Sequence, residues 1–124
     1  MNNPKKITIA EDDQFLSNAY RVKLTKEGYN VKMVADGQEL IDSLKTDKPD
    51  LIILDLLMPK KDGFEALKEI KANPNLKNVP VIIASNLGQT NDIDQGMKLG
   101  ASDYIVKSDL SLEDLVKKIK DFIK

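Results

Sequence analysis

Five short apolar runs alternate strictly with stretches of helical pattern along this chain. The apolar runs lie at residues 7–10, 31–34, 51–54, 81–84 and 104–106. Their length and bounding turn residues indicate strands. The helical stretches lie at residues 14–27, 38–45, 63–72, 92–99 and 112–123. Such alternation predicts a parallel sheet covered by helices on both faces, so we expect a doubly wound α/β fold.

Two sequence signals fix where helices begin. Asp13 stands before the first helical stretch and is expected to cap it. Ser111 and Asp114 resemble a capping box at the start of the last helix. The apolar residues of that last helix fall on one face, which predicts that this face packs on the sheet. They are Leu112, Leu115, Val116, Ile119, Phe122 and Ile123.

Composition limits the chain to one core and removes several kinds of chemistry. Its 124 residues, 41% of them hydrophobic, predict a single domain over residues 1–124. Cysteine and histidine are absent, which excludes disulfides, thiolate nucleophiles and the usual general base. A formal net charge of −1 gives no field that attracts nucleic acid or an anionic membrane. Without a membrane-span pattern or a secretory signal, a cytoplasmic protein is expected.

Polar side chains follow four of the five apolar runs. Because parallel strands end at one edge of a sheet, where α/β folds bind their ligands, we expect these side chains to share one site. If the first, third, fourth and fifth runs are neighbouring strands, a spacing of about 4.8 Å places Asp12 and Ser85 beside Asp55. The long side chain of Lys107 can then reach from the fifth run to the same place. The residues are Glu11, Asp12 and Asp13 after the first run, Asp55 after the third, Ser85 after the fourth and Lys107 after the fifth.

The converging carboxylates indicate a cation site. Acids in a partly dry crevice repel one another, which raises their pKa values unless a cation compensates. Mg²⁺ prefers oxygen ligands and takes one or two protein carboxylates with phosphate oxygens, so Asp12 and Asp55 suit it. With the metal and Lys107 balancing charge, the Asp55 carboxylate can attack a phosphoryl group and form an acyl phosphate. Asp55 is therefore predicted to be a nucleophile.

These residues resemble the receiver domain of two-component response regulators, of the stand-alone chemotaxis or sporulation type. The resemblance covers essentially the whole chain and implies a flavodoxin-like, five-stranded parallel sheet of order 2-1-3-4-5 with five helices. Its markers are the acidic pair Glu11 and Asp12, the segment 51–55, the loop residues Met58, Pro59, Asp62 and Gly63, the hydroxyl of Ser85, and the segment 100–107.

The resemblance also implies a metal and a phosphoryl donor. The metal is Mg²⁺ or Mn²⁺, held by Asp12, Asp55 and the backbone carbonyl of Leu57, with Glu11 acting through water. Lys107 assists the reaction as a charge partner. The donor is a phosphohistidine on a sensor histidine kinase or a histidine phosphotransfer protein, which fits a chain without histidine. The chain is not expected to be an enzyme beyond catalysing its own phosphorylation and dephosphorylation.

The same resemblance implies how the signal is read. Ser85 moves to bond a phosphoryl oxygen, and Tyr104 turns inward as a second switch residue. These changes remodel the face formed by the fourth helix, the fifth strand and the fifth helix, which an output protein reads. The shift between states can be no larger than the difference in phosphoryl contacts between them. No direct contact with nucleic acid is expected.

Some residues depart from the family pattern. Ser108 follows Lys107 where proline is usual, and a cis bond before a residue other than proline costs about 3 to 4 kcal/mol, so a trans bond is expected. Asn86 stands where smaller residues are common. Leu57 and Leu87 are apolar where other members place groups that orient water. We therefore expect phosphate on the chain to be lost slowly.

Other functions fit these residues less well or differ in context. A phosphatase of the haloacid dehalogenase type, which also forms an aspartyl phosphate, would need a second aspartate where Leu57 stands. A flavodoxin-type flavin carrier would need a glycine- and hydroxyl-rich loop after the first run, where Glu11, Asp12 and Asp13 repel phosphate. The sequence leaves open that this is the receiver of a longer, DNA-binding response regulator.

Overall fold

The computed structural model describes residues 4–58, 60–109 and 111–123, and Pro59 lies outside them. Within these ranges no helix is both long and apolar enough to cross a membrane. In chain order the elements are β1 (Lys6–Ala10), α1 (Gln14–Lys26), β2 (Asn30–Val34), α2 (Gly37–Leu44), β3 (Leu51–Leu54), α3 (Gly63–Ala72), β4 (Val81–Ser85), α4 (Thr90–Lys98), β5 (Asp103–Val106), the short 3-10 helix η1 (Lys107–Asp109) and α5 (Leu112–Phe122).

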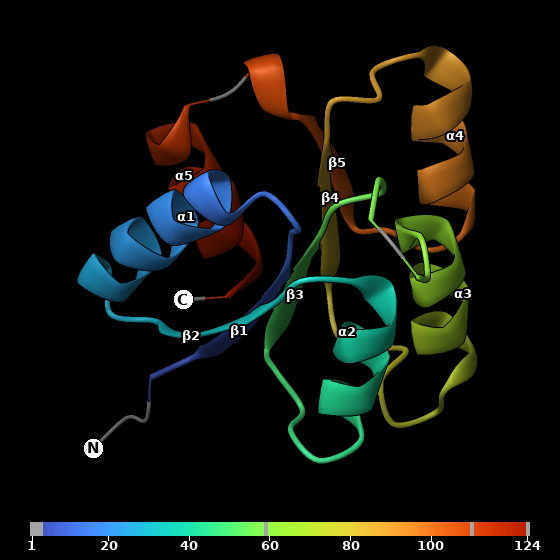
Figure 1. Ribbon diagram of the computed structural model, residues 1–124, viewed down its shortest axis with the longest axis horizontal. Helices are drawn as coiled ribbons and strands as arrows, with labels where there is room; N and C mark the ends of the chain where they lie inside the picture. Colours follow the sequence, from blue (N-terminus) through green and yellow to red (C-terminus); the bar gives the residue numbers. More distant parts are fainter. Residues whose placement is uncertain (1–3, 59, 110, 124) are drawn as a thin grey trace.

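The five strands form one parallel sheet in the order β2-β1-β3-β4-β5. Figure 1 shows the sheet nearly edge-on, with α1 and α5 on one side and α2, α3 and α4 on the other. The order reverses between β1 and β3, where the crossovers diverge to opposite faces. The predicted doubly wound, flavodoxin-like fold and its strand order are confirmed.

The central strands β3 and β4 are buried at every position because helices cover both faces of the sheet. Alternate residues therefore face two different cores. Ile52 and Leu54 pack under α2 and α3, whereas Leu51 and Ile53 pack under α1 and α5. This explains why the sequence of β3 is apolar throughout and does not alternate.

Helix caps follow the expected residues at two places. The Asp13 side chain accepts hydrogen bonds from the amides of Phe15 and Leu16 at the start of α1. Ser111 and Asp114 form the predicted capping box of α5.

The bond between Lys107 and Ser108 is trans, as expected, since no cis peptide occurs in the described ranges.

Apart from element bounds that differ by one residue, three details differ from the sequence expectations. The helix α4 begins at Thr90, two residues early, because its N-cap Gln89 makes no side-chain capping bond and gives no signal. A short 3-10 helix follows β5, where the sequence indicated none. Phe122, expected on the packed face of α5, is 39% exposed; the backbone becomes extended at the C-cap Ile123, and the side chain of Ile123 is buried instead.

Candidate metal centre

The carboxyl ends of β1 and β3 place two acids side by side. Ala10 pairs with Leu54 in the sheet, so Glu11 and Asp55 leave the sheet together. The Asp55 amide donates to the Ala10 carbonyl at 3.0 Å, and the Glu11 amide donates to the Val34 carbonyl at 3.0 Å. Backbone bonds of the sheet therefore extend up to both acidic residues and fix their positions.

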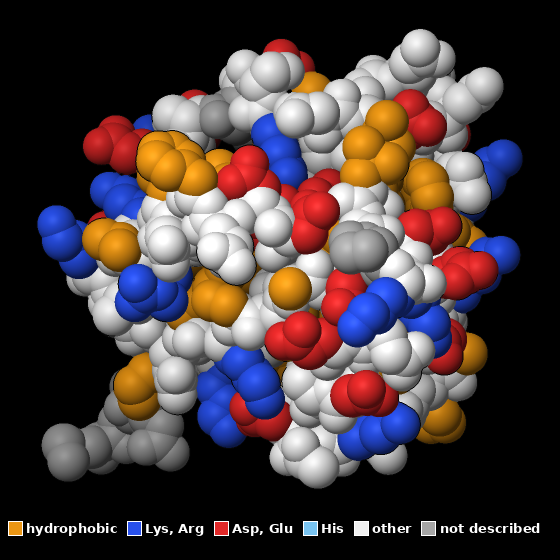
Figure 2. All heavy atoms as spheres, in the orientation of Figure 1, with side chains coloured by type: hydrophobic (Ala, Val, Ile, Leu, Met, Phe, Trp, Pro, Cys, Tyr) orange, Lys and Arg blue, Asp and Glu red, His pale blue; other side chains and the backbone are white. Residues whose placement is uncertain are grey.

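Asp12 joins this pair to form an acidic cluster. One carboxylate oxygen each from Glu11, Asp12 and Asp55 lies within 4.8 Å of the others. Figure 2 shows acidic side chains gathered near the middle of this face of the molecule, over the region where Figure 1 places the ends of β1 and β3. Glu11 and Asp55 are 4% and 5% exposed, whereas Asp12 is exposed to solvent. The cluster thus has a buried floor and an open side.

Nearby amides orient the two buried carboxylates. The Leu57 amide donates to Asp55 Oδ1 at 3.3 Å. The Asp13 amide donates to Glu11 Oε2 at 3.2 Å. Each contact uses one oxygen of its carboxylate, which leaves lone pairs for a cation or a phosphoryl group.

Lys107, the first residue after β5, reaches across to both buried acids. Its Nζ lies 3.3 Å from Asp55 Oδ2 and hydrogen-bonds Glu11 Oε1. Burial lowers the pKa of Lys107, but the hydrogen bond to Glu11 and the charges of Asp55 and Glu11 outweigh it, so the pKa is raised. Lys107 therefore stays protonated at neutral pH.

One lysine does not balance three carboxylates. Burial raises the pKa of Glu11 to about 7, and repulsion by Asp55 adds to this, against the opposing bonds from Lys107 and the Asp13 amide. An added cation would relieve this repulsion. An all-oxygen donor set with two or three carboxylates and an open side is the chemistry that Mg²⁺ and Mn²⁺ prefer.

Ser85 is the last residue of β4, and both Ser85 and Tyr104 hydrogen-bond the main chain of Leu87. The Ser85 side chain is 0% exposed, and its Oγ accepts a hydrogen bond from the Leu87 amide at 3.2 Å. The hydroxyl of Tyr104 donates to the carbonyl of the same Leu87. Tyr104 is half-buried and packs against the core under α2 and α3. Asn86, between Ser85 and Leu87, is exposed.

The loop from β3 to α3 holds Leu57, another residue that the sequence indicated for the site. The side chain of Leu57 is 58% exposed, while its amide faces Asp55. Gly37 and Lys61, which no sequence pattern indicated as functional, contact each other where α2 meets this loop. The only signal was the Asp36 and Gly37 pair, which sequence alone presents as an ordinary turn.

Comparison with known proteins gives a consistent result. The model of the response regulator receiver domain matches residues 7–120. The response regulator RR06 of Streptococcus pneumoniae serotype 2 (strain D39) is 40% identical over 118 residues, which make up 95% of this chain and 52% of that protein. The chain spans about half the length of the curated relatives it matches.

Solved structures agree with this match. The receiver domain of the sensor histidine kinase PA1611 from Pseudomonas aeruginosa PAO1, described with a magnesium ion coordinated in its active-site cleft, superposes with a TM-score of 0.88 at 28% identity, covering 97% of this chain and 98% of that one. The Mn²⁺-bound form of response regulator Rcp1 gives 0.80 at 32% identity, covering 95% and 91%. From the family match, the sequence identity and the shared fold, the chain belongs to the response regulator receiver domain family.

Proposed function

We propose that this chain is a phosphoryl-accepting switch of a two-component phosphorelay and that Asp55 is its phosphoacceptor. The observation that carries the proposal is the placement of the Asp55 carboxylate. It is buried at the end of β3, within 4.8 Å of oxygens from Glu11 and Asp12 and 3.3 Å from Lys107 Nζ. A nucleophile, a cation site and a fixed positive charge therefore lie at one place.

Asp12, Asp55 and the Leu57 carbonyl would hold the metal, with Glu11 acting through water. Two findings support this assignment: the carboxylates form the one acidic cluster of suitable spacing among the described residues, and two similar receivers are described with Mg²⁺ and Mn²⁺. When bound, Mg²⁺ or Mn²⁺ supplies positive charge at the phosphoryl oxygens.

The reaction is a transfer between two nucleophiles. An oxygen of the Asp55 carboxylate forms a bond to phosphorus, the bond between phosphorus and the histidine nitrogen of the donor breaks, and the imidazole leaves with the electron pair. Lys107, fixed between Asp55 and Glu11, balances charge on the transferred group. The chain then catalyses only its own phosphorylation and the later hydrolysis of its acyl phosphate.

The readout begins at Ser85. When its hydroxyl turns to a phosphoryl oxygen on Asp55, the Leu87 amide loses its present acceptor, and the loop after β4 is released from that bond. Tyr104 bonds the same residue from β5, so the change extends to the face of α4, β5 and α5. An output protein would bind this face, and phosphorylation would shift the population of the competent state.

The partners and the wider context follow from the same proposal. The donor is a sensor histidine kinase or a histidine phosphotransfer protein. Residues 1–124 form one receiver, which acts alone or as the regulatory part of a longer protein. The second arrangement is favoured by relatives such as the transcriptional regulatory protein PhoP of Bacillus subtilis. PhoP is 33% identical over 103 residues, which make up 83% of this chain and 42% of that protein.

Phosphoryl uptake from acetyl phosphate, with and without Mg²⁺, tests the proposal. The native chain should be modified only with the metal, and Asp55→Asn should not be modified. Asp121→Asn, an equivalent change at an exposed position of α5, is the matched control and should behave as the native chain. Equal uptake by native and Asp55→Asn chains, or uptake that ignores Mg²⁺, would refute the assignment.

A further inference from the structure

The loop between β3 and α3 is closed and anchored at both ends. The Gly63 amide donates to the Leu56 carbonyl at 3.0 Å, which joins the two ends of the loop. A Cβ built on Gly63 would lie 2.4 Å from the Asp55 carbonyl oxygen and 2.7 Å from Leu56 Cα. The start of α3 therefore sits directly against the residue that carries the nucleophile. Leu57, next to Leu56, and Lys61, two residues before Gly63, both belong to the loop that this bond closes.

Gly37, the first residue of α2, touches the middle of this loop. A Cβ built on Gly37 would lie 2.1 Å from the Lys61 carbonyl oxygen and 2.9 Å from Lys61 Cβ, closer than real Cβ atoms come. The backbone conformation of Gly37 does not itself require glycine, since the glycines with positive φ in the described ranges are Gly28 and Gly100. The requirement for glycine comes from the close approach alone.

Two ion pairs reinforce this contact. Lys60, which has a left-handed φ of 68°, places Nζ 3.8 Å from Asp36 Oδ2. The other oxygen of Asp36 caps α2 by accepting from the Glu39 amide at 2.8 Å. Lys61 pairs with Glu69 of α3. The start of α2 and the flank of α3 thus hold two successive loop residues.

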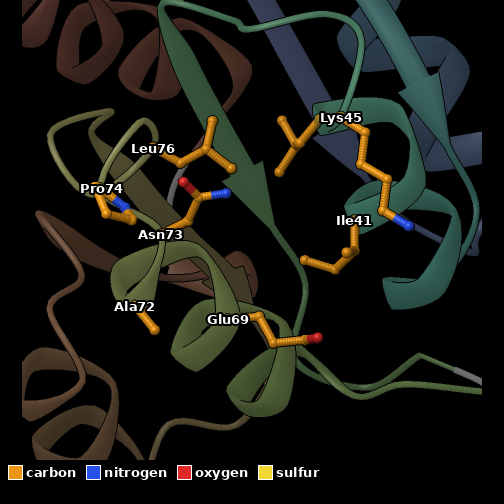
Figure 3. A pocket seen from close by; sticks show the side chains of 8 residues that line it. Ile41, Lys45, Glu69, Ala72, Asn73, Pro74 and Leu76 are labelled. Carbon is orange, nitrogen blue, oxygen red and sulfur yellow. The ribbon is translucent and has the colours of Figure 1, made fainter.

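The packing between α2 and α3 is less complete near their carboxyl ends. At their carboxyl ends, α2 and α3 are separated by a cavity of about 520 Å³, lined by residues such as Ile41, Lys45, Asn73 and Leu76. Figure 3 shows Ile41 and Leu76 facing this cavity from opposite sides, with Glu69 at its edge. The close backbone approach of α2 to the loop after Asp55 is made at Gly37, away from this cavity.

We infer that Asp36 and Gly37 form a positioning element for the metal centre: Gly37 lets the Lys61 carbonyl lie against α2, and this contact sets where the loop presents the Leu57 carbonyl. The inference rests on the proposed function, which assigns that carbonyl to the metal. A side chain at Gly37 displaces the loop and weakens metal binding, although every carboxylate of the cluster is unchanged.

The test is the Mg²⁺ dissociation constant, measured by NMR titration of backbone amides in the native chain and in Gly37→Ala. Loss of a residue that orients a metal ligand typically weakens affinity about 10- to 100-fold, and this range is expected here. Gly28→Ala is the matched control, because it strains a φ of 96° in the turn before β2, with nothing within 4 Å of its Cβ. It should lose stability to urea and keep native affinity.

Glu69→Gln provides a second variant that alters an exposed helix position without threatening the fold. Loss of its ion pair with Lys61 should weaken Mg²⁺ binding by about two- to fivefold, the scale of a partly exposed pair. Native affinity in Gly37→Ala, or equal weakening in Gly28→Ala, would overturn the inference. If Gly37→Ala does not fold, native affinity in Glu69→Gln overturns it. A native chain that binds no Mg²⁺ would instead refute the proposed function itself.

Discussion

Asp55 and Glu11 are the residues at which burial and charge are most opposed in this molecule. Both carboxylates are about nineteen-twentieths buried, at 5% and 4% exposure, and they share one ammonium group, that of Lys107. Burial raises the pKa of Glu11 to about 7 although Lys107 hydrogen-bonds it, so the single ammonium group does not fully compensate the acids. The residues therefore form a site that gains from an added cation, which ordinary surface acids do not.

Leu57 and Leu87 are predicted to prolong the phosphorylated state. Leu57 is largely exposed and Leu87 is half-buried, and neither side chain can orient a water molecule for attack on the acyl phosphate. In Leu57→Asn and Leu87→Gln the rate of phosphate loss should rise by about tenfold, because an oriented water reacts faster. The rate is measured after removal of the phosphoryl donor.

Leu57→Met and Leu87→Met are the controls for these two positions. They keep an apolar side chain of similar volume and should leave the rate of phosphate loss unchanged. An equal lifetime in the polar and apolar variants would show that these side chains do not govern hydrolysis.

The helix α3 begins directly against the residue that carries the proposed nucleophile. Gly63→Ala should lower the free energy of unfolding by about 2 kcal/mol, because the added methyl meets backbone atoms of Asp55 and Leu56 that cannot move aside. Gly96→Ala in α4 should cost less, since its nearest neighbour is the end of the Ile83 side chain. Urea unfolding measures both, with exposed Lys68→Ala as the control. A smaller loss for Gly63→Ala than for Gly96→Ala would contradict this packing.

A second element-scale contact ties the end of α1 to α5. Lys120 Nζ lies 2.8 Å from Glu27 Oε1, and this hydrogen bond, followed by the charge of Lys120, lowers the pKa of Glu27 below its ordinary value. A carboxyl whose pKa is lower in the folded state stabilises the fold above its unfolded pKa. That contribution is lost as the pH falls through the folded value.

The pH dependence of this contact can be measured directly. The Glu27 carboxyl, followed by NMR, should titrate below 4.5 in the native chain and move up towards 4.5 in Lys120→Gln. The acid loss of stability should be correspondingly less steep in the variant, and the difference should shrink in high salt because the pair is exposed. Identical titration of Glu27 in both chains would show that the pair does not form in solution.

At the scale of the whole molecule, the sequence determines the architecture well. The bounds of β3 match the expectation because a strand buried on both faces is apolar at every residue. The bounds of α3 match because Asp62 and Gly63 mark its start. The convergence of Glu11, Asp12, Asp55 and Lys107 followed from strand ends that share one edge of the sheet, with the strand order that the family resemblance implied.

Contacts between distant segments could not be predicted in the same way. Nothing near Gly37 in sequence indicates that Lys61 will lie against it, because the approach depends on how two crossovers pack. Likewise the hydrogen bond of the Tyr104 hydroxyl depends on the Leu87 carbonyl, which the loop after β4 presents. Sequence patterns report burial and local turns, whereas these features depend on tertiary packing.

The most direct test of the central claim is to locate the phosphoryl group. The native chain is incubated with acetyl phosphate and Mg²⁺, the acyl phosphate is trapped by borohydride reduction, and the modified residue is identified by peptide mass spectrometry. We expect modification at Asp55 alone. Modification found at Glu11 or Asp12, or retained in Asp55→Asn, would contradict the assignment of Asp55 as the phosphoacceptor.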